Sequence, residues 1–310
     1  WVETIMATFE GGMLNQASLV DEGLYLSADG NGYSQLFLVT NEGDSIELPL
    51  PMDAAINDLG FSEGGDEVFA HLSTWLEPPS VWRFDRSGRS ERIDLTPPWL
   101  VDVTAYDARR IMVSARDGES VPLTVILPRN LVLDGSAPCM VTAYGAYGMS
   151  LSADFNPLGV ALLERGGILA IAHVRGGGER GLPWWRAGKG PTKPNTWRDL
   201  IDCCQHLVEA GATAPDRLGI MGSSAGGIAV GRAMTERPDL FALVVSGAGV
   251  LNPLRFEAET NGLANVSEFG SVTNQGGFLG LQAMDTLHHI QDGTRYPTVL
   301  LEHGVNDRRV

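Results

Sequence analysis

Up to about residue 100 the chain alternates short apolar runs with turn-forming residues at intervals of about eight to twelve residues. Two stretches, SADGNGYSQLFLVTNEG and PPSVWRFDRSGRSERI, share a plan of strand, tight turn and second strand. This spacing predicts about two blades of about 40 to 50 residues each, as in a β-propeller. A generic β-sandwich fits the pattern of residues 1–100 equally well. The runs read as strands are GLYLSAD, QLFLVTNEGDSIELPL, EVFAHLST and VWRFDRSGRSERIDL.

From Val101 onward the period changes, and apolar strands alternate with helical patterns. In WRDLIDCCQHLVEAG the apolar residues recur at helical spacing and the pattern stops at Gly211. Buried strands that alternate with helices predict a doubly wound, mostly parallel sheet, so the fold class is α/β. Binding sites in such sheets gather at the carboxyl ends of the strands. The predicted strands lie in RRIMVSAR, VPLTVILP, PCMVTAYG, GILAIAHV, RLGIMGSS, ALVVSGAG and TVLLEHG.

Composition and charge limit the classes of molecule that this protein is expected to bind. The 310 residues are 44% hydrophobic and carry a net charge of -16, which argues against nucleic acid and against an anionic membrane surface. No apolar run reaches the roughly 18 residues that a membrane span needs. We expect a soluble protein, cytoplasmic or periplasmic, of unknown oligomeric state. The start, WVETIMATFEGG, has no initiator Met and no signal-like run, so we expect the chain to begin inside a longer protein.

The cysteines and histidines indicate no metal or cofactor. Cys203 and Cys204 are adjacent, and with the third cysteine they form neither a disulfide framework nor a metal-ligand spacing. We expect all three to be small buried residues. The pair His288 and His289 lacks a third ligand at a suitable spacing.

A nucleophile pattern, Gly-Ser-Ser-Ala-Gly, surrounds Ser224. The apolar run from Leu218 to Met221 predicts a strand before it, and IAVGRAMTERPDL predicts a helix after it. A serine at such a strand-to-helix turn is the arrangement called the nucleophile elbow, in which glycines relieve crowding around a strained backbone. The alternative is a helix start rich in serine and glycine that only caps the helix.

Acyl transfer also needs oxyanion donors and an acid. The backbone N–H of Ala225 follows from the elbow itself. A second donor must come from the loop after an earlier strand, where PCMVTAYGAYG offers Tyr144 or a backbone amide; packing under the loop is the alternative for Tyr144 and Tyr147. The strand in TVLLEHGVND ends in a polar turn with Asp307, in the chain order of α/β-hydrolases.

Together these stretches resemble the prolyl oligopeptidase family of serine peptidases. They follow the family's order and spacing across essentially all of residues 101–310. The resemblance implies an α/β-hydrolase catalytic domain over residues 101–310, preceded by part of a β-propeller over residues 1–100. The matching stretches are YGAYG at 144–148, RGGGERG at 175–181, WRDLIDCCQHLVEAG, RLGIMGSSAGG, RPDLFALVVSGAGVLNPLRF at 237–256 and HGVNDRRV at 303–310.

Roles carry over by position in the matching stretches. Ser224 matches the nucleophile and Asp307 the acid that orients the base, while the Ala225 N–H and the Tyr144 hydroxyl match the oxyanion hole. Arg309 matches an arginine that holds a substrate carbonyl. The positions that line the pocket for the residue before the scissile bond are matched by Tyr147, Phe269 and Val310.

Two departures from the family qualify the expected activity. Where post-proline cleaving members stack a tryptophan on the substrate proline, this chain has Asn265; where basic-residue-cleaving relatives have acidic groups, it has Asn265 and Ser267, with Glu268 alongside. We therefore expect a peptidase that acts on short peptides and leave its specificity open. An esterase or acyl-peptide hydrolase with the same machinery, or a non-catalytic binding protein, is the alternative.

The second departure is the histidine that should take the proton of the serine. By chain order it should follow Asp307, so we expect it beyond residue 310. Removing the base of such a triad costs about 10⁶-fold in turnover, and residues 1–310 alone should be close to inactive. A structural role is expected for each histidine that is present: His71, His173, His206, His288, His289 and His303.

Overall fold

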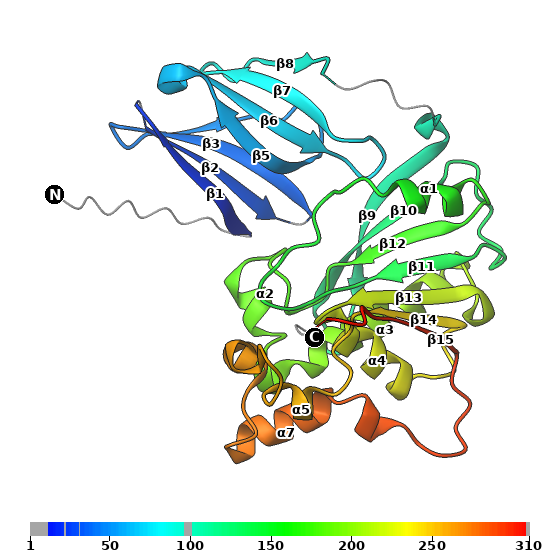
Figure 1. Ribbon diagram of the computed structural model, residues 1–310. Helices are drawn as coiled ribbons and strands as arrows, with labels where there is room; N and C mark the ends of the chain where they lie inside the picture. The colour runs from blue at the N-terminus through cyan, green and yellow to red at the C-terminus, as the bar shows by residue number, and fades with distance from the viewer. Residues whose placement is uncertain (1–11, 22, 31, 96–100, 308–310) are drawn as a thin grey trace. The chain divides into compact units, whose positions relative to one another are not determined.

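The computed structural model describes residues 12–21, 23–30, 32–95 and 101–307 (Figure 1). Contacts divide the chain into two compact units. The first, called the β-rich unit, comprises Trp1–Val101, Ser152–Phe155 and Gly178–Leu182. The second, called the α/β unit, comprises Asp102–Leu151, Asn156–Gly177 and Pro183–Val310.

The described part of the β-rich unit contains two four-stranded antiparallel sheets, each a meander in chain order. The short helix η1 (Glu63–Gly65) joins two strands of the second sheet. The first sheet consists of β1 (Met13–Val20), β2 (Gly23–Gly30), β3 (Tyr33–Thr40) and β4 (Ser45–Leu48). The second consists of β5 (Ala55–Phe61), β6 (Glu67–Ser73), β7 (Ser80–Asp85) and β8 (Ser90–Ile93).

Alternation of side chains builds the core of this unit. Along β3 every second residue from Ser34 to Leu38 is buried, as the period of two in a strand requires. Leu36 on β3, Leu72 on β6 and Phe84 on β7 belong to one apolar cluster that takes residues from both sheets. Four-stranded meanders of this kind are the building unit of a β-propeller.

A seven-stranded sheet forms the centre of the described α/β unit, in the order β15-β14-β13-β11-β12-β10-β9. β9 and β10 form an antiparallel hairpin, β10 pairs antiparallel with β12, and the other neighbours are parallel. The predicted doubly wound, mostly parallel sheet is therefore present. Its strands are β9 (Tyr106–Ser114), β10 (Ser120–Pro128), β11 (Cys139–Thr142), β12 (Ile168–Ala172), β13 (Leu218–Ser223), β14 (Leu243–Gly247) and β15 (Thr298–Glu302).

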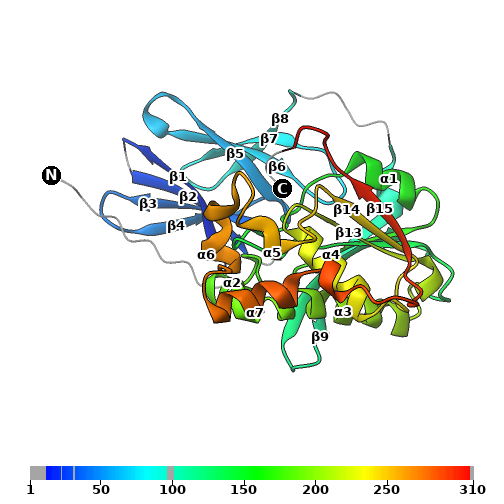
Figure 2. The same cartoon turned by 60° about the horizontal axis from the view of Figure 1, so that its bottom comes forward.

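Helices cover both faces of this sheet. α1 (Pro157–Leu163) lies on one face, and α3 (Pro194–Glu209) and α4 (Gly226–Glu236) lie together on the other (Figures 1 and 2). Right-handed crossovers explain this, because the chain leaves β11 toward β12 and then returns past β11 to β13. The remaining helices are α2 (Leu182–Arg186), α5 (Pro253–Phe256), α6 (Val266–Phe269) and α7 (Gln275–Met284), with the short helices η2 (Val103–Ala105), η3 (Gly190–Thr192), η4 (Pro215–Arg217), η5 (Gly262–Asn265) and η6 (Leu287–His289).

The periodicity of α3 predicted its buried face. Leu200, Ile201, Cys204 and Leu207 are 0–2% exposed, and the Trp197 indole donates to Glu236 on α4 at 2.7 Å. The helix begins at Pro194, three residues before the apolar pattern, because proline fits the first turn of a helix. All three cysteines are buried, as expected, and burial raises the pKa of the Cys139 thiol to about 12.

No helix within the described ranges is long and apolar enough to cross a membrane. At the edge of the seven-stranded sheet, β15 is exposed along its whole length. Its apolar side chains Val299, Leu300 and Leu301 are 42–62% exposed. The edge strand that carries the loop to Asp307 is thus the least buried strand of the described sheet.

Candidate active site

Ser224 lies in the predicted strand-to-helix turn, between the end of β13 and the start of α4. Its φ angle is 52°, a left-handed conformation that costs a non-glycine residue about 1–3 kcal/mol. Three backbone hydrogen bonds hold it: the Ser224 N–H donates to Gly247 at 3.0 Å, and its carbonyl accepts from Gly227 and Val250 at 2.9 Å each. The strained elbow is therefore present. Hydrogen bonds with the end of β14 and with the loop that follows it hold Ser224 in this conformation.

Steric requirements explain the glycines around this serine. A Cβ on Gly226 would lie 2.8 Å from the Ala143 carbonyl oxygen, and one on Gly227 would lie 2.6 Å from the Gly249 Cα. A Cβ on Gly222 would collide with the carbonyl of Gly226. The backbones that follow β11 and β14 approach the start of α4 closely here, so the turn requires these glycines.

The candidate oxyanion donors lie beside this turn. Ala225 immediately precedes α4, so its amide belongs to the positive end of the helix, and no acceptor for it occurs in the part of the chain that is described. Tyr144 follows β11, the parallel neighbour of β13, and its Cδ2 lies 3.5 Å from a Cβ built on Gly226. Tyr144 also packs against the apolar core, so packing and a place at the elbow are compatible.

Three predicted pocket residues also meet. The Tyr147 hydroxyl donates to Asn265 Oδ1 at 2.5 Å, and its ring contacts that of Phe269 edge-on at 5.5 Å between centroids. Tyr147 has a φ of 59° and is 37% exposed, while Phe269 is 2% exposed. Asn265 therefore gives this cluster a polar hydrogen-bonded wall where a tryptophan would give a flat apolar one.

Two buried charged residues, Glu268 and Lys193, contact the loop that carries Tyr147. The sequence analysis noted Glu268 but missed Lys193. Glu268 is 2% exposed and accepts hydrogen bonds from the Tyr147 N–H at 2.8 Å and from Trp185 Nε1 at 3.0 Å. Lys193 is fully buried and its ammonium donates to the Gly145 carbonyl. Burial lowers the pKa of Lys193 to about 8, against the opposing influence of the Glu268 charge. A signal existed in the composition, because the sequence has only two lysines, Lys189 and Lys193, among 22 basic residues.

Asp307 lies in an exposed turn after β15, where its N–H donates to the Gly304 carbonyl at 3.0 Å. β15 pairs in parallel with β14 so that Glu302 faces Gly247, the residue whose carbonyl accepts from Ser224. The acid loop and the elbow therefore start from the same edge of the sheet, two strands apart. Arg309 and Val310, the other two predicted site residues, lie outside the described residues.

The histidines occupy other places. His173 is buried with Nε2 2.8 Å from Thr124 Oγ1, and His288 Nδ1 lies 2.8 Å from the buried carboxylate of Asp285. Within the described ranges, no histidine forms a hydrogen bond with Ser224, and no group of three or more His, Cys, Asp or Glu residues could hold a metal ion. His71 lies in β6, His206 in α3, His289 in η6 and His303 just after β15.

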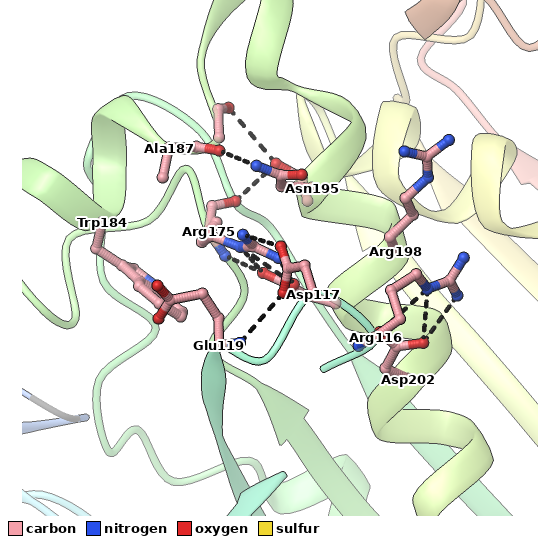
Figure 3. A network of polar contacts seen from close by, with 12 residues as sticks. Arg116, Asp117, Glu119, Arg175, Trp184, Ala187, Asn195, Arg198 and Asp202 are labelled. Atoms are coloured by element: carbon pink, nitrogen blue, oxygen red, sulfur yellow. Dashed lines mark hydrogen bonds and ion pairs between the residues drawn. The ribbon is translucent and has the colours of Figure 1, made fainter. Parts of the chain in front are cut away.

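Arg175, the first residue of the RGGGERG stretch, has a structural role (Figure 3). Arg175 follows β12, and its guanidinium binds Asp199 of α3 and Asp117 of the β9–β10 turn at 2.6 Å each. Burial disfavours the charged guanidinium, but the hydrogen bonds to both carboxylates outweigh this and raise the pKa of Arg175. Burial raises the pKa of Asp199 despite its partner. This network anchors the loop after β12 to α3, near the segment that Lys193 contacts.

Comparison with known proteins identifies relatives over most of the chain. A family model described as the prolyl oligopeptidase family matches residues 153–310. A prolyl endopeptidase from Elizabethkingia miricola is 28% identical over 313 residues, covering 100% of this chain and 44% of that protein. A prolyl endopeptidase from Dictyostelium discoideum is 31% identical over 271 residues, covering 86% of this chain and 35% of that protein.

Solved structures agree with the sequence relatives. One from an analysis of two prolyl endopeptidases has a TM-score of 0.88 and 29% identity, covering 96% of this chain and 44% of that one. Oligopeptidase B from Trypanosoma brucei with covalently bound antipain has a TM-score of 0.90 and 25% identity, covering 98% and 45%. The chain thus spans less than half the length of these relatives.

These neighbours decide between the two interpretations of residues 1–100. Their fold joins a β-propeller to an α/β-hydrolase domain, so the two four-stranded sheets are part of a propeller and the β-sandwich interpretation is wrong. The α/β fold class is confirmed. With a matching family model over half of its residues and relatives over its whole length, the chain belongs to the prolyl oligopeptidase family.

Proposed function

We propose that this chain carries the nucleophile and most of the substrate site of a serine peptidase that hydrolyses short peptides. The observation that carries the proposal is the left-handed backbone of Ser224 at the amino end of α4. A strained serine persists only where its surroundings hold it, and such strain clusters at catalytic sites. We assign residues 101–310 to the catalytic domain and residues 1–100 to about two blades of a propeller.

In the proposed reaction the Ser224 hydroxyl attacks the carbonyl carbon of the scissile bond and passes its proton to a general base. The negative oxygen that develops is bound by the Ala225 N–H and the Tyr144 hydroxyl. The base then protonates the leaving amine. In the second half of the reaction the base takes a proton from water, the water oxygen attacks the acyl carbonyl, and the base returns the proton to the Ser224 oxygen as the acid leaves. We assign the base to a histidine outside residues 1–310, oriented by Asp307, and no metal or cofactor enters any step.

The substrate pocket is proposed to use Tyr147, Asn265 and Phe269, together with Arg309 and Val310. The 2.5 Å hydrogen bond between Tyr147 and Asn265 supports a wall that accepts polar or small side chains. It gives no flat apolar surface on which a proline ring could stack. We therefore propose that proline before the scissile bond is not strongly preferred, and that a small acyl ester is an alternative substrate.

Labelling with a fluorophosphonate probe tests the nucleophile, using the protein expressed from its complete reading frame. We expect wild type to be labelled and Ser224→Ala to be unlabelled and inactive toward peptides. Ser223→Ala is the matched control, because Ser223 is the exposed neighbouring hydroxyl at the end of β13 and should leave labelling unchanged. Equal labelling of Ser224→Ala and wild type would refute the assignment, and no labelling of any protein would favour the non-catalytic binding function.

A substrate panel tests the pocket. Peptides and simple esters that differ only in the residue before the scissile bond should show kcat/KM for proline no more than about tenfold above that for alanine. Asn265→Trp should raise the preference for proline by restoring a stacking surface. A wild-type preference of several hundredfold for proline would contradict the proposed wall, while hydrolysis of esters alone would favour the esterase alternative.

A further inference from the structure

Lys193 occupies an unusual place for a lysine, because its side chain is fully buried immediately before α3. Its ammonium donates to the Gly145 carbonyl and lies 5.5 Å from the centroid of the Phe269 ring. The other lysine of the sequence, Lys189, is only partly buried, and its ammonium lies 3.9 Å from the centroid of the Trp185 ring. Of the two lysines, Lys193 is the one whose ammonium binds the backbone of the Gly145–Tyr147 segment.

The Glu268 carboxylate provides the opposite charge. Its Oε1 accepts from the Tyr147 N–H and its Oε2 from Trp185 Nε1. Glu268 is the charged group whose field acts on Lys193. The segment from Gly145 to Tyr147 is thus held by a cation on one carbonyl and by an anion on the amide two residues later.

This segment needs such support. Gly145 has a φ of 68° and Tyr147 a φ of 59°, so two left-handed residues stand within three positions. A Cβ on Gly145 would collide with Thr196 and Val174, which leaves the segment no room to relax on that side. Hydrogen bonds to charged groups are about twice as strong as neutral ones, which makes them suited to fix a strained backbone.

We propose that Lys193 and Glu268 are positioning residues for the site: together they fix the Gly145–Tyr147 segment, so that Tyr144 at one end keeps its place beside the elbow and Tyr147 keeps its ring in the pocket. The catalytic consequence rests on the proposed function, whereas the structural pairing does not. Burying two charged side chains seldom stabilises a fold compared with apolar side chains of the same volume, so orientation of the segment explains these two residues better than stability does.

Three variants of the protein from its complete reading frame test the catalytic consequence. Lys193→Met keeps the length of the side chain and removes its charge and donors, and Glu268→Gln keeps the shape and removes the opposite charge. Lys189→Met is the matched control. We expect the first two to lower the rate of fluorophosphonate labelling and kcat by tenfold or more, because a small misplacement of an oxyanion donor is costly. Lys189→Met should stay within twofold of wild type.

Unfolding in urea, measured on the same proteins, separates positioning from collapse. Lys193→Met is expected to remain folded with a midpoint equal to or above that of wild type while its labelling is slow. Wild-type labelling rates in both Lys193→Met and Glu268→Gln would overturn the proposal. The proposal would also be overturned if both variants were labelled slowly only because part of each protein is unfolded.

A measurement that needs no activity tests the pairing itself. Protein labelled with ¹³C at lysine Cε gives one side-chain signal per lysine, and the signal that Lys193→Met removes is that of Lys193. We expect this signal to titrate near pH 8 in wild type and at a lower pH in Glu268→Gln, because the stabilising negative charge is gone. Titration near pH 10.5 that ignores Glu268→Gln would refute the pairing. If the pairing is found and Ser224→Ala still labels like wild type, the proposed function is wrong and the pairing stands.

Discussion

At the level of single residues, the strain of Ser224 depends on neighbours that have no side chain. Gly227→Ala places a methyl group against the Gly249 backbone. The atoms that it meets are backbone atoms, which cannot move aside as the end of a flexible side chain can. We expect it to lower the free energy of unfolding by about 1–3 kcal/mol, as overpacking of a tight core does, and to slow labelling of Ser224. Urea unfolding and labelling with a fluorophosphonate measure the two effects.

The control for this substitution is Gly276→Ala. Gly276 is an exposed residue of α7 with ordinary space around it, and alanine there should stabilise the chain by about 0.4–1 kcal/mol. A Gly227→Ala chain as stable as Gly276→Ala would show that the elbow can relax, and that the glycine is not needed for packing.

Lys193 makes stability depend on pH with a definite sign. Burial lowers the pKa of Lys193 from 10.5 to about 8, so between these values the unfolded chain binds more protons than the folded chain. The free energy of unfolding contributed by this group therefore rises with pH, by up to about 1.4 kcal/mol per pH unit. The three buried cysteines act in the opposite direction, because burial raises the pKa of their thiols and the unfolded thiols ionise first.

The comparison of wild type with Lys193→Met isolates the lysine, since both chains keep the cysteines. From pH 7.5 to 9.5 the free energy of unfolding of wild type should rise by about 2 kcal/mol relative to that of Lys193→Met, measured in urea. A difference that stays constant over this range would mean that Lys193 is not buried as a titrating group.

At the level of elements, the Arg175 network decides how firmly α3 is attached to the loop after β12. Asp199 has no exposed surface and binds Arg175 through both carboxylate oxygens. Asp199→Asn should cost about 3–5 kcal/mol, because it leaves a buried guanidinium without its main partner. The control is Asp202→Asn on the same helix. It removes one of the two carboxylates that bind Arg116, a half-exposed arginine of the β9–β10 turn, and should cost at most about 1 kcal/mol. Similar losses from the two substitutions would contradict the assigned difference in burial.

Local pattern predicted most elements of the α/β unit and missed two strands of the β-rich unit. In α3 and β13 the apolar spacing coincides with the buried face, so the period was enough. β1 is an edge strand with no fully buried residue, and β5 carries Asn57, Asp58 and Gly60 and a break in its register. Neither sequence has the regular apolar alternation of a strand, so each resembles a loop. Their strand structure depends on pairing with the neighbouring strands β2 and β6.

At the level of the whole molecule, the site divides into parts that local sequence could and could not predict. The strand order of the sheet brings Tyr144 to the elbow, and that order follows from a recognisable alternation of strands and helices. Lys193 and Glu268 contact the same Gly145–Tyr147 segment but stand 75 positions apart in the sequence, with α3, β13, α4 and β14 between them. The scarcity of lysine singles out Lys189 and Lys193 in the sequence, but only the folded chain shows that Lys193 and Glu268 are both buried.

The arrangement of charge over the whole chain leads to a last prediction. The net charge is -16, and many arginines already bind carboxylates; within the described ranges these include Arg83, Arg86, Arg116, Arg175 and Arg237. Nucleic acid binding needs clustered cations that are free to replace the counterions of phosphate. We therefore expect no change in the fluorescence anisotropy of a labelled DNA duplex at about 50 mM salt, a condition that favours such binding. Binding that weakens steeply as salt is added would show that a basic surface exists in spite of the net charge.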